Sequence, residues 1–164
     1  MNKKLVTQRL IGYRLGETYC MSATTSLDAV ITAPKSFQII PGTKPYFSDS
    51  SRIGREVVSY FHLPTFLGLS QPQAQSNNDH PSTLITRDPL SSSVIGLQMD
   101  AVIDFVLISQ IEDANKNELS IPAKLAPYCT GVVKAKDRLW ALVHLEQILS
   151  DPNFRAVELP VQRP

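Results

Sequence analysis

The sequence predicts an all-β fold made of two similar subdomains. Its apolar residues come in short runs, rich in β-branched and aromatic side chains and bounded by Pro, Gly, Ser or Asp, which is typical of the strands of a barrel or sandwich. Twelve prolines among 164 residues disfavour long helices. Similar blocks of sequence also recur in the two halves of the chain, and such self-similarity indicates an internal repeat.

Each expected strand is an apolar run between residues that favour turns. The main runs are residues 10–11, 37–40, 57–63, 94–97, 102–108 and 139–145. Two short helices are expected, at residues 22–30, where Ser and Thr are available as caps, and at residues 145–149, where Asp151-Pro152 would end the helix. Residues 71–82 contain one Ala and no other apolar residue, so we expect a solvated loop between the two halves; residues 112–120 are expected to form a second loop.

Two Tyr–His pairs with the same spacing mark the expected repeat. Tyr46 precedes His62 by sixteen residues, and Tyr128 precedes His144 by the same number. The blocks that resemble each other are residues 57–63 with 139–145 and residues 27–31 with 99–103. Because the order of the blocks agrees, we expect residues 1–164 to form one domain of two superposable β units, with the tyrosines and histidines at matching places.

Composition narrows the functional classes. The net charge of +1 argues against a dedicated nucleic-acid-binding protein, which normally carries a marked basic excess. Two cysteines are too few for a disulfide scaffold, and we expect free thiols, with Cys20 buried. No apolar run is long enough for a signal peptide or a transmembrane helix, so we expect a cytoplasmic protein without direct membrane insertion.

The sequence contains no strong catalytic or metal-binding motif. Gly-x-Ser-x-Gly, Gly-x-Gly-x-x-Gly, Cys-x-x-Cys and His-Glu-x-x-His are all absent, so no cofactor or metal is predicted. His62 and His144 are expected at strand ends, where they meet solvent or a backbone group, and Asp100 is expected to cap or to face solvent. The basic cluster at residues 134–138 is expected to be a solvated hairpin turn. The alternative is a small β-barrel enzyme that uses Asp100, His62 or His144.

Five blocks of sequence, in this order, match the pattern of a known family. They read Tyr-Arg-Leu-Gly-Glu-Thr-Tyr at 13–19, Ile-Pro-Gly-Thr-Lys-Pro-Tyr at 40–46, Val-Val-Ser-Tyr-Phe-His-Leu at 57–63, Gly-Leu-Gln-Met-Asp-Ala-Val at 96–102 and Trp-Ala-Leu-Val-His-Leu at 140–145. In these blocks the chain resembles the CheW-like domain, the small coupling proteins of bacterial chemosensory systems, from about Arg9 to Leu149. Its opening is most similar to the PilI-type members linked to type IV pilus twitching motility.

The resemblance implies a fold of two small barrels of about five strands each, with short helices. It also implies a non-catalytic adaptor that couples a chemoreceptor to a CheA-like histidine kinase, at membrane-associated receptor arrays. In this picture the groove between the barrels holds the helical tip of the receptor, and an apolar barrel end docks on the kinase. A degenerate structural subunit of a signalling array, without receptor binding, is the alternative within the same family.

The chain departs from the family pattern at the positions that the family uses for partners. The family turn Asn-Leu-Arg-Gly reads Arg-Ile-Gly-Arg at 52–55, and the family pair Glu-Val reads Val30-Ile31. We expect the partner-binding residues at these two places, with the arginines on an exposed turn between two strands and the apolar pair beside that turn. The expected partner-binding residues are Val30, Ile31, Arg52, Gly54 and Arg55.

Overall fold

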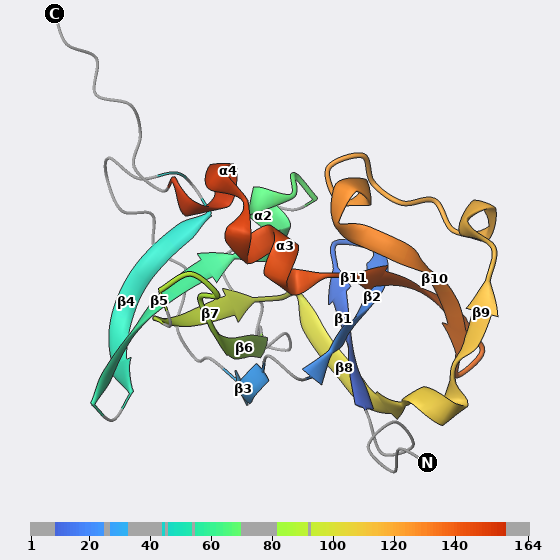
Figure 1. The fold of residues 1–164 in the computed structure, drawn as a ribbon, viewed down its shortest axis with the longest axis horizontal. Coiled ribbons are helices and arrows are strands. Elements are labelled where there is room, and N and C mark those ends of the chain that lie inside the picture. Colours follow the sequence, from blue (N-terminus) through green and yellow to red (C-terminus); the bar gives the residue numbers. More distant parts are fainter. Residues whose placement is uncertain are drawn as a thin grey trace, which may run out of the picture.

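The computed structural model describes residues 9–24, 27–32, 44, 46–53, 55–69, 82–91 and 93–156. These residues form mainly β-strands in two curved sheets, with short helices between the sheets on one side of the molecule (Figure 1). The all-β prediction is therefore confirmed. The expected strand at 37–40 and residues 71–81 of the expected loop lie outside the described residues.

Six strands form the larger sheet, in the order β8-β1-β2-β11-β10-β9. Their bounds are β1 Arg9–Leu15, β2 Thr18–Ala23, β8 Ala101–Leu107, β9 Glu112–Ala114, β10 Cys129–Ala135 and β11 Arg138–Val143. Neighbouring strands are antiparallel except β2 and β11, which run parallel. Lys136 and Asp137 form the tight turn between β10 and β11, so the predicted basic hairpin turn is confirmed.

Five strands form the smaller sheet, in the order β3-β6-β7-β5-β4. Their bounds are β3 Leu27–Thr32, β4 Phe47–Ile53, β5 Glu56–His62, β6 Ser82–Arg87 and β7 Val94–Gln98. Five strands of the larger sheet, in the order β8-β1-β2-β11-β10, have the same arrangement. In both sheets the third and fourth strands of this order run parallel: β2 with β11, and β7 with β5. Within the described residues neither sheet pairs its first strand with its last, so the two units are open curved sheets of six and five strands instead of two five-stranded barrels.

The tyrosines and histidines of the expected repeat stand at matching places in the two sheets. His62 directly precedes the short helix α2 (Leu63–Phe66), and its backbone N–H donates to the carbonyl oxygen of Tyr46 at 2.6 Å. His144 directly precedes helix α3 (Leu145–Ser150), and its N–H donates to the carbonyl oxygen of Tyr128 at 2.9 Å. The origin of the two halves by duplication stays a prediction.

Two expected elements are wrong. The helix expected over residues 22–30 is contradicted by the described residues, because Ser22 and Ala23 complete β2 and residues 27–30 begin β3. The Ser22 hydroxyl, instead of capping a helix, hydrogen-bonds the Tyr13 hydroxyl at 2.6 Å and donates to the carbonyl oxygen of Val143 at 2.8 Å. The expected loop at 112–120 contains strand β9, which pairs with β10 and so adds the sixth strand to the larger sheet.

The helices are all short. The helix expected at residues 145–149 is α3, which Asp151 ends, and a second helix, α4 (Pro152–Arg155), follows it. Single 3-10 turns are η2 (Ile108–Gln110), η3 (Lys116–Glu118) and η4 (Ala126–Tyr128). Among the described residues, no helix has the length and apolar character that a membrane span requires.

Buried side chains form one shared core and one smaller core in each sheet. The shared core contains residues of both sheets and of the helices, among them Tyr13, Leu97 and Leu145. The core of the larger sheet consists of Met21, Val106, Val133, Ala135 and Trp140, and that of the smaller sheet of Val58, Tyr60, Ile85 and Val94. Each sheet therefore curves around apolar side chains of its own and packs on the other through the shared core.

Candidate partner-binding surfaces

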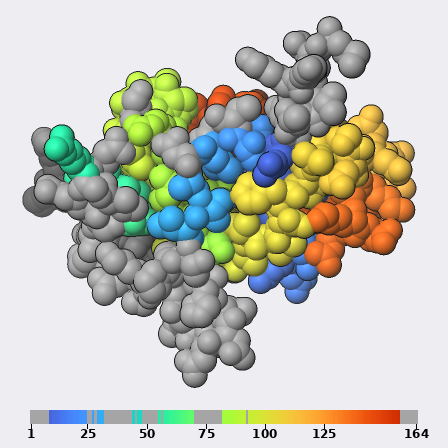
Figure 2. All heavy atoms as spheres, turned by 90° about the horizontal axis from the view of Figure 1, so that it is seen from below, coloured from blue at the N-terminus to red at the C-terminus, as the bar shows by residue number. Residues whose placement is uncertain are grey.

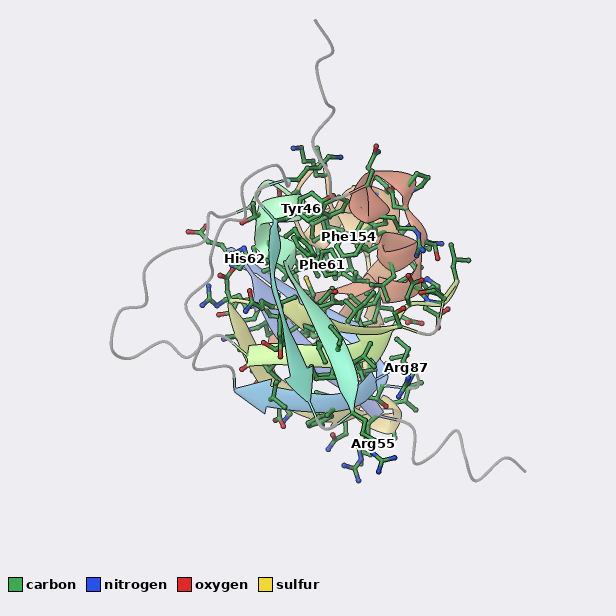
Figure 3. The ribbon with its side chains drawn as sticks, turned by 90° about the vertical axis from the view of Figure 1, so that its left-hand side faces the viewer. Tyr46, Arg55, Phe61, His62, Arg87 and Phe154 are labelled. Carbon is green, nitrogen blue, oxygen red and sulfur yellow. The ribbon has the colours of Figure 1, made fainter. Side chains whose placement is uncertain are left out.

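The predicted arginine site lies at the end of the β4–β5 hairpin. The ladder between these strands continues to the pair Ile53 and Glu56, and Arg55 lies exposed on the turn, where its side chain points away from the sheet (Figure 3). Arg52 lies in strand β4, opposite Val57, and not on the turn as expected, because the strand pairing extends beyond it. Gly54 lies outside the described residues.

The predicted apolar pair lies on a different edge of the smaller sheet. Val30 and Ile31 belong to β3, at the opposite edge from β4, with three strands between them. The expectation that this pair lies beside the arginine turn is therefore wrong, because β3 and β4 are at opposite edges of the sheet. Val30 leaves 36% of its surface exposed, whereas Ile31 packs partly against the core of the smaller sheet.

Strand β8 carries a row of exposed apolar side chains that the sequence reasoning missed. Side chains alternate between the two faces of a strand, and Val106 on the inner face is fully buried. On the outer face, Ile103, Phe105 and Leu107 remain 43%, 45% and 37% exposed. The apolar run at residues 102–108 is the only sequence signal for this row, and such a run fits a strand that is buried on both faces; in the structure β8 is an edge strand with only one face covered.

The exposed side chains of β3 and β8 lie on one side of the molecule. Figure 2 shows these two strands on the same face, one from each sheet. We call Val30, Ile103, Phe105 and Leu107 the apolar face. Single exposed apolar side chains are ordinary, but several that alternate along one edge strand are typical of an interaction surface.

A hollow of about 370 Å³ opens at one end of the larger sheet. Its apolar lining comes from Leu10, Met21, Ile108, Val133 and Leu142, among others, and its polar residues include Asp113 and His144. At the other end of the same strands, the Arg138 guanidinium lies 3.8 Å from the centre of the Tyr19 ring, and Lys136 forms an ion pair with Asp104. One end of the sheet interior is therefore covered by polar contacts, and the other presents apolar surface.

Two of the three polar residues considered for catalysis, His62 and Asp100, make hydrogen bonds within the local structure. His62 is buried, and its Nδ1 accepts the backbone N–H of Thr65 at 3.3 Å and hydrogen-bonds the Thr65 hydroxyl at 2.6 Å, so that it caps α2. Burial lowers the pKa of His62, against an opposing effect of Asp100. The Asp100 carboxylate accepts the backbone N–H of Gly16 at 2.5 Å. His144 lies exposed at the end of the other sheet. This arrangement fits the expected strand-end and capping roles.

Neither cysteine has the environment of a reactive thiol. Cys20 is fully buried and Cys129 partly buried, and both are free. Burial raises the pKa of both thiols, which keeps them protonated near neutral pH. In the part of the chain that the structure describes, no group of three or more His, Cys, Asp or Glu side chains is placed to hold a metal ion.

The sequence pattern of the CheW-like domain matches residues 9–153. The chain belongs to the CheW-like domain family. It is also similar to the crystal structure of the scaffolding protein TtCheW from Thermoanaerobacter tengcongensis, with a TM-score of 0.66, 17% sequence identity and coverage of 90% of both chains. No curated protein matches the sequence.

Membership of the CheW-like family confirms the resemblance seen in the sequence, and the similarity to TtCheW shows the fold. The matched structure is that of a scaffolding protein, not of an enzyme. The assignment to the PilI-type branch stays a prediction. For a CheW-like domain, the surfaces of interest are those that can receive other proteins: the apolar face, the hollow and the β4–β5 turn.

Proposed function

We propose that this CheW-like domain is a non-catalytic adaptor that couples a chemoreceptor to a CheA-like histidine kinase in the cytoplasm, in a signalling system for type IV pilus twitching motility. The observation that carries the proposal is the row of uncovered apolar side chains on the edge strands of both sheets. An enzyme needs converging polar groups, whereas an adaptor needs apolar surface to bind its partners.

The apolar face supports docking of a receptor helix. An amphipathic helix binds by laying apolar side chains, spaced three or four residues apart, along an apolar surface. Ile103, Phe105 and Leu107 offer such a surface along β8, and β3 of the second sheet, which carries the exposed Val30, lies on the same side of the molecule. Phe105 supplies the largest side chain of the row, and aromatic residues are enriched among those that dominate binding energy.

The hollow at the end of the larger sheet supports docking of the kinase. It combines an apolar lining with polar groups such as Asp113 and His144, which is the composition of a protein interface with an apolar centre and a polar rim. This site uses the end of the larger sheet, and the receptor site uses the outer face of β8. One molecule of the adaptor is therefore proposed to bind both partners together.

A bridging experiment tests the function. Beads carry the purified cytoplasmic tip of a chemoreceptor from the same organism, and a purified CheA-like kinase is added with or without the chain. The proposal predicts that the kinase stays on the beads only when the chain is present. Capture of the kinase by the chain, without any capture by receptor beads, would favour the structural-subunit alternative, and binding of neither partner would contradict the adaptor function.

A further inference from the structure

Helix α4 follows the larger sheet in the chain but is anchored in the smaller sheet. Phe154 of α4 is fully buried among three aromatic rings, with ring centres 4.7 Å from Phe61, 5.1 Å from Phe66 and 5.8 Å from Tyr46. These rings belong to β5, to α2 and to the turn before β4, and Figure 3 shows the labelled members close together. Aromatic packing thus brings the end of the described chain onto the smaller sheet.

Directional hydrogen bonds fix the anchored helix. The Tyr46 hydroxyl donates to the carbonyl oxygens of Asn153 and Phe154, at 2.7 and 3.0 Å. The Arg155 guanidinium donates to Asp88, in the loop between β6 and β7, at 2.6 Å, with side chains that are 32% and 11% exposed. Although burial opposes it, this contact holds the pKa of Asp88 below its ordinary value.

The other end of α4 is held from the larger sheet. Asp151 caps α4, and its carboxylate accepts the hydroxyl of Tyr128 at 2.5 Å. Tyr128 directly precedes β10, and it stands at the place that Tyr46 occupies beside the smaller sheet. Burial, together with Asp151, raises the pKa of both tyrosines to about 12, so both remain hydrogen-bond donors at neutral pH. The two matching tyrosines therefore bind the two ends of one helix.

The connection matters because no strand of one sheet pairs with a strand of the other within the described residues. Besides α4, the sheets meet through the shared apolar core and through the β7–β8 connection, where the N–H groups of Met99 and Asp100 donate to the carbonyl oxygens of Ser82 and Arg14. This connection joins the sheets at one point, and apolar packing is non-directional, so it permits small shifts more readily than hydrogen bonds do. The hydrogen bonds of α4 add a second fixed point. In Figure 1, α4 lies at the top and β3 at the bottom, and Figure 2 views the molecule from below, where β3 and β8 are seen. The helix and the apolar face are thus on opposite sides of the contact between the sheets.

We propose that α4 sets the position of one sheet relative to the other, with Tyr46, Tyr128 and Arg155 as positioning residues. The apolar face takes side chains from both sheets, so its shape depends on this position. The proposed effect on receptor binding rests on the function proposed above, whereas the effect on the sheets themselves does not. When these hydrogen bonds are removed, each sheet keeps its own core and the distance between the sheets becomes variable.

A distance measurement by pulsed EPR tests this proposal without any partner. Spin labels are placed at Val57→Cys on β5 and Lys134→Cys on β10, both exposed, in a Cys129→Ser background, while the fully buried Cys20 does not react. The double variant Tyr46→Phe with Tyr128→Phe keeps both rings and loses both hydroxyls. We expect its distance distribution to be at least about twofold broader than that of the otherwise unaltered labelled protein.

Tyr13→Phe is the matched control. Its hydroxyl bonds Ser22 within the larger sheet, so the control loses a buried tyrosine hydrogen bond of the same kind but should keep the narrow distribution. An unchanged distribution in the double variant, or equal broadening in the control, would overturn the proposal. If the double variant does not fold, the labelled Arg155→Gln variant is measured instead. A broader distance distribution would then support the proposal, and an unchanged distribution would overturn it. A chain that shows the broadening but never binds a receptor would refute the proposed function and leave this inference standing.

Discussion

At the scale of single residues, Gly96 allows close packing of neighbouring side chains in the smaller sheet. A Cβ atom at Gly96 would lie 2.6 Å from Cδ1 of the Tyr60 ring and 3.0 Å from Cγ2 of Thr83. Tyr60 is buried in the core of the smaller sheet, so its ring has little room to move. The absence of a side chain at this position is therefore what allows the ring to cover the strand.

We accordingly predict that Gly96→Ala lowers the free energy of unfolding by about 1–3 kcal/mol, because overpacking a buried site forces neighbours away from their preferred positions. Urea denaturation measures the change. Gly131→Ala is the matched control, since its Cβ would meet only Cδ1 of Leu142 at an ordinary 3.9 Å. Equal stability of Gly96→Ala and the unaltered protein would show that the ring is not confined as described.

A second residue-scale prediction concerns acid. Burial lowers the pKa of His62 below its ordinary 6.5, so the unfolded chain binds the proton more readily than the folded one. Where the unfolded state binds more protons, stability rises with pH. The contribution of neutral His62 is therefore complete above about pH 6.5 and is lost as the pH falls towards the pKa of the folded state.

Urea denaturation at pH 7.5 and at pH 5.5 tests this dependence. The unaltered protein should be less stable at the lower pH, and His62→Asn, which keeps an acceptor at the start of α2, should lose much less. His144→Asn replaces the matching exposed histidine and should retain the full dependence on pH. The same loss in His62→Asn as in the unaltered protein would assign the effect to other groups.

At the scale of elements, the two tight hairpins of the larger sheet differ in backbone conformation, because the β1–β2 turn has a positive φ at one residue and the β10–β11 turn at two. Gly16, in the β1–β2 turn, has a φ of 61°, which glycine adopts without strain. Lys136 and Asp137, in the β10–β11 turn, have φ values of 51° and 59°, which cost energy for residues with a Cβ. A two-residue turn with positive φ at both positions favours Asn-Gly.

The replacement of Lys136 by Asn together with Asp137→Gly should therefore raise the free energy of unfolding by about 0.5–1 kcal/mol, as judged by thermal and urea denaturation. The ion pair of Lys136 with Asp104 is lost, but both side chains are about half exposed and such pairs contribute little. Gly16→Ala should act in the opposite direction, because its Cβ would be strained and would lie 3.2 Å from Cβ of Leu69. Destabilisation by the Asn-Gly turn would contradict this account.

The elements also show how far local sequence can predict this fold. The strands at residues 57–63, 94–97 and 139–145 are predictable because turn-forming residues bound an apolar run, and α3 because Asp151-Pro152 ends it. The helix expected at residues 22–30 failed because pairing with β1 and β6 outweighs local capping propensity. Strand β9 was not predictable from its polar residues, since its pairing with β10 is a tertiary contact.

The candidate site was predictable only in part. Val30 and Arg55 are exposed, and their role in binding stays a prediction. Their separation on the sheet depends on strand order, which a linear sequence does not contain. The exposure of the outer face of β8 could not be predicted for the same reason. An apolar run such as residues 102–108 fits a fully buried strand equally well, and only the edge position of β8 reveals that one side is uncovered.

At the scale of the whole molecule, two similar sheets offer several separate surfaces to other proteins. The proposed arginine site lies at the end of the β4–β5 hairpin of the smaller sheet, away from the hollow of the larger sheet. Arginine side chains recognise carboxylates on a partner through charge-assisted hydrogen bonds. We propose that this surface binds an acidic region of the receptor or the kinase.

Reversal of both charges, with Arg52→Glu and Arg55→Glu, tests the arginine site. Thermal stability should change little, because the pair lies at the end of a hairpin and Arg55 is exposed. Capture of the kinase or the receptor should weaken at least about tenfold, equivalent to about 1.4 kcal/mol. A folded double variant that captures both partners as well as the unaltered chain would remove these residues from the site.

We propose above that the apolar face of the two edge strands binds the receptor. A fluorescence titration with the purified cytoplasmic tip of the receptor compares Phe105→Ser with the control Leu90→Ser. Leu90 is also apolar, but it lies in the loop between β6 and β7 and is 68% exposed, whereas Phe105 is 45% exposed. We expect Phe105→Ser to raise Kd at least about tenfold and Leu90→Ser to leave Kd unchanged, with both variants folded. Equal affinity of Phe105→Ser and the unaltered chain for the receptor tip would contradict this proposal.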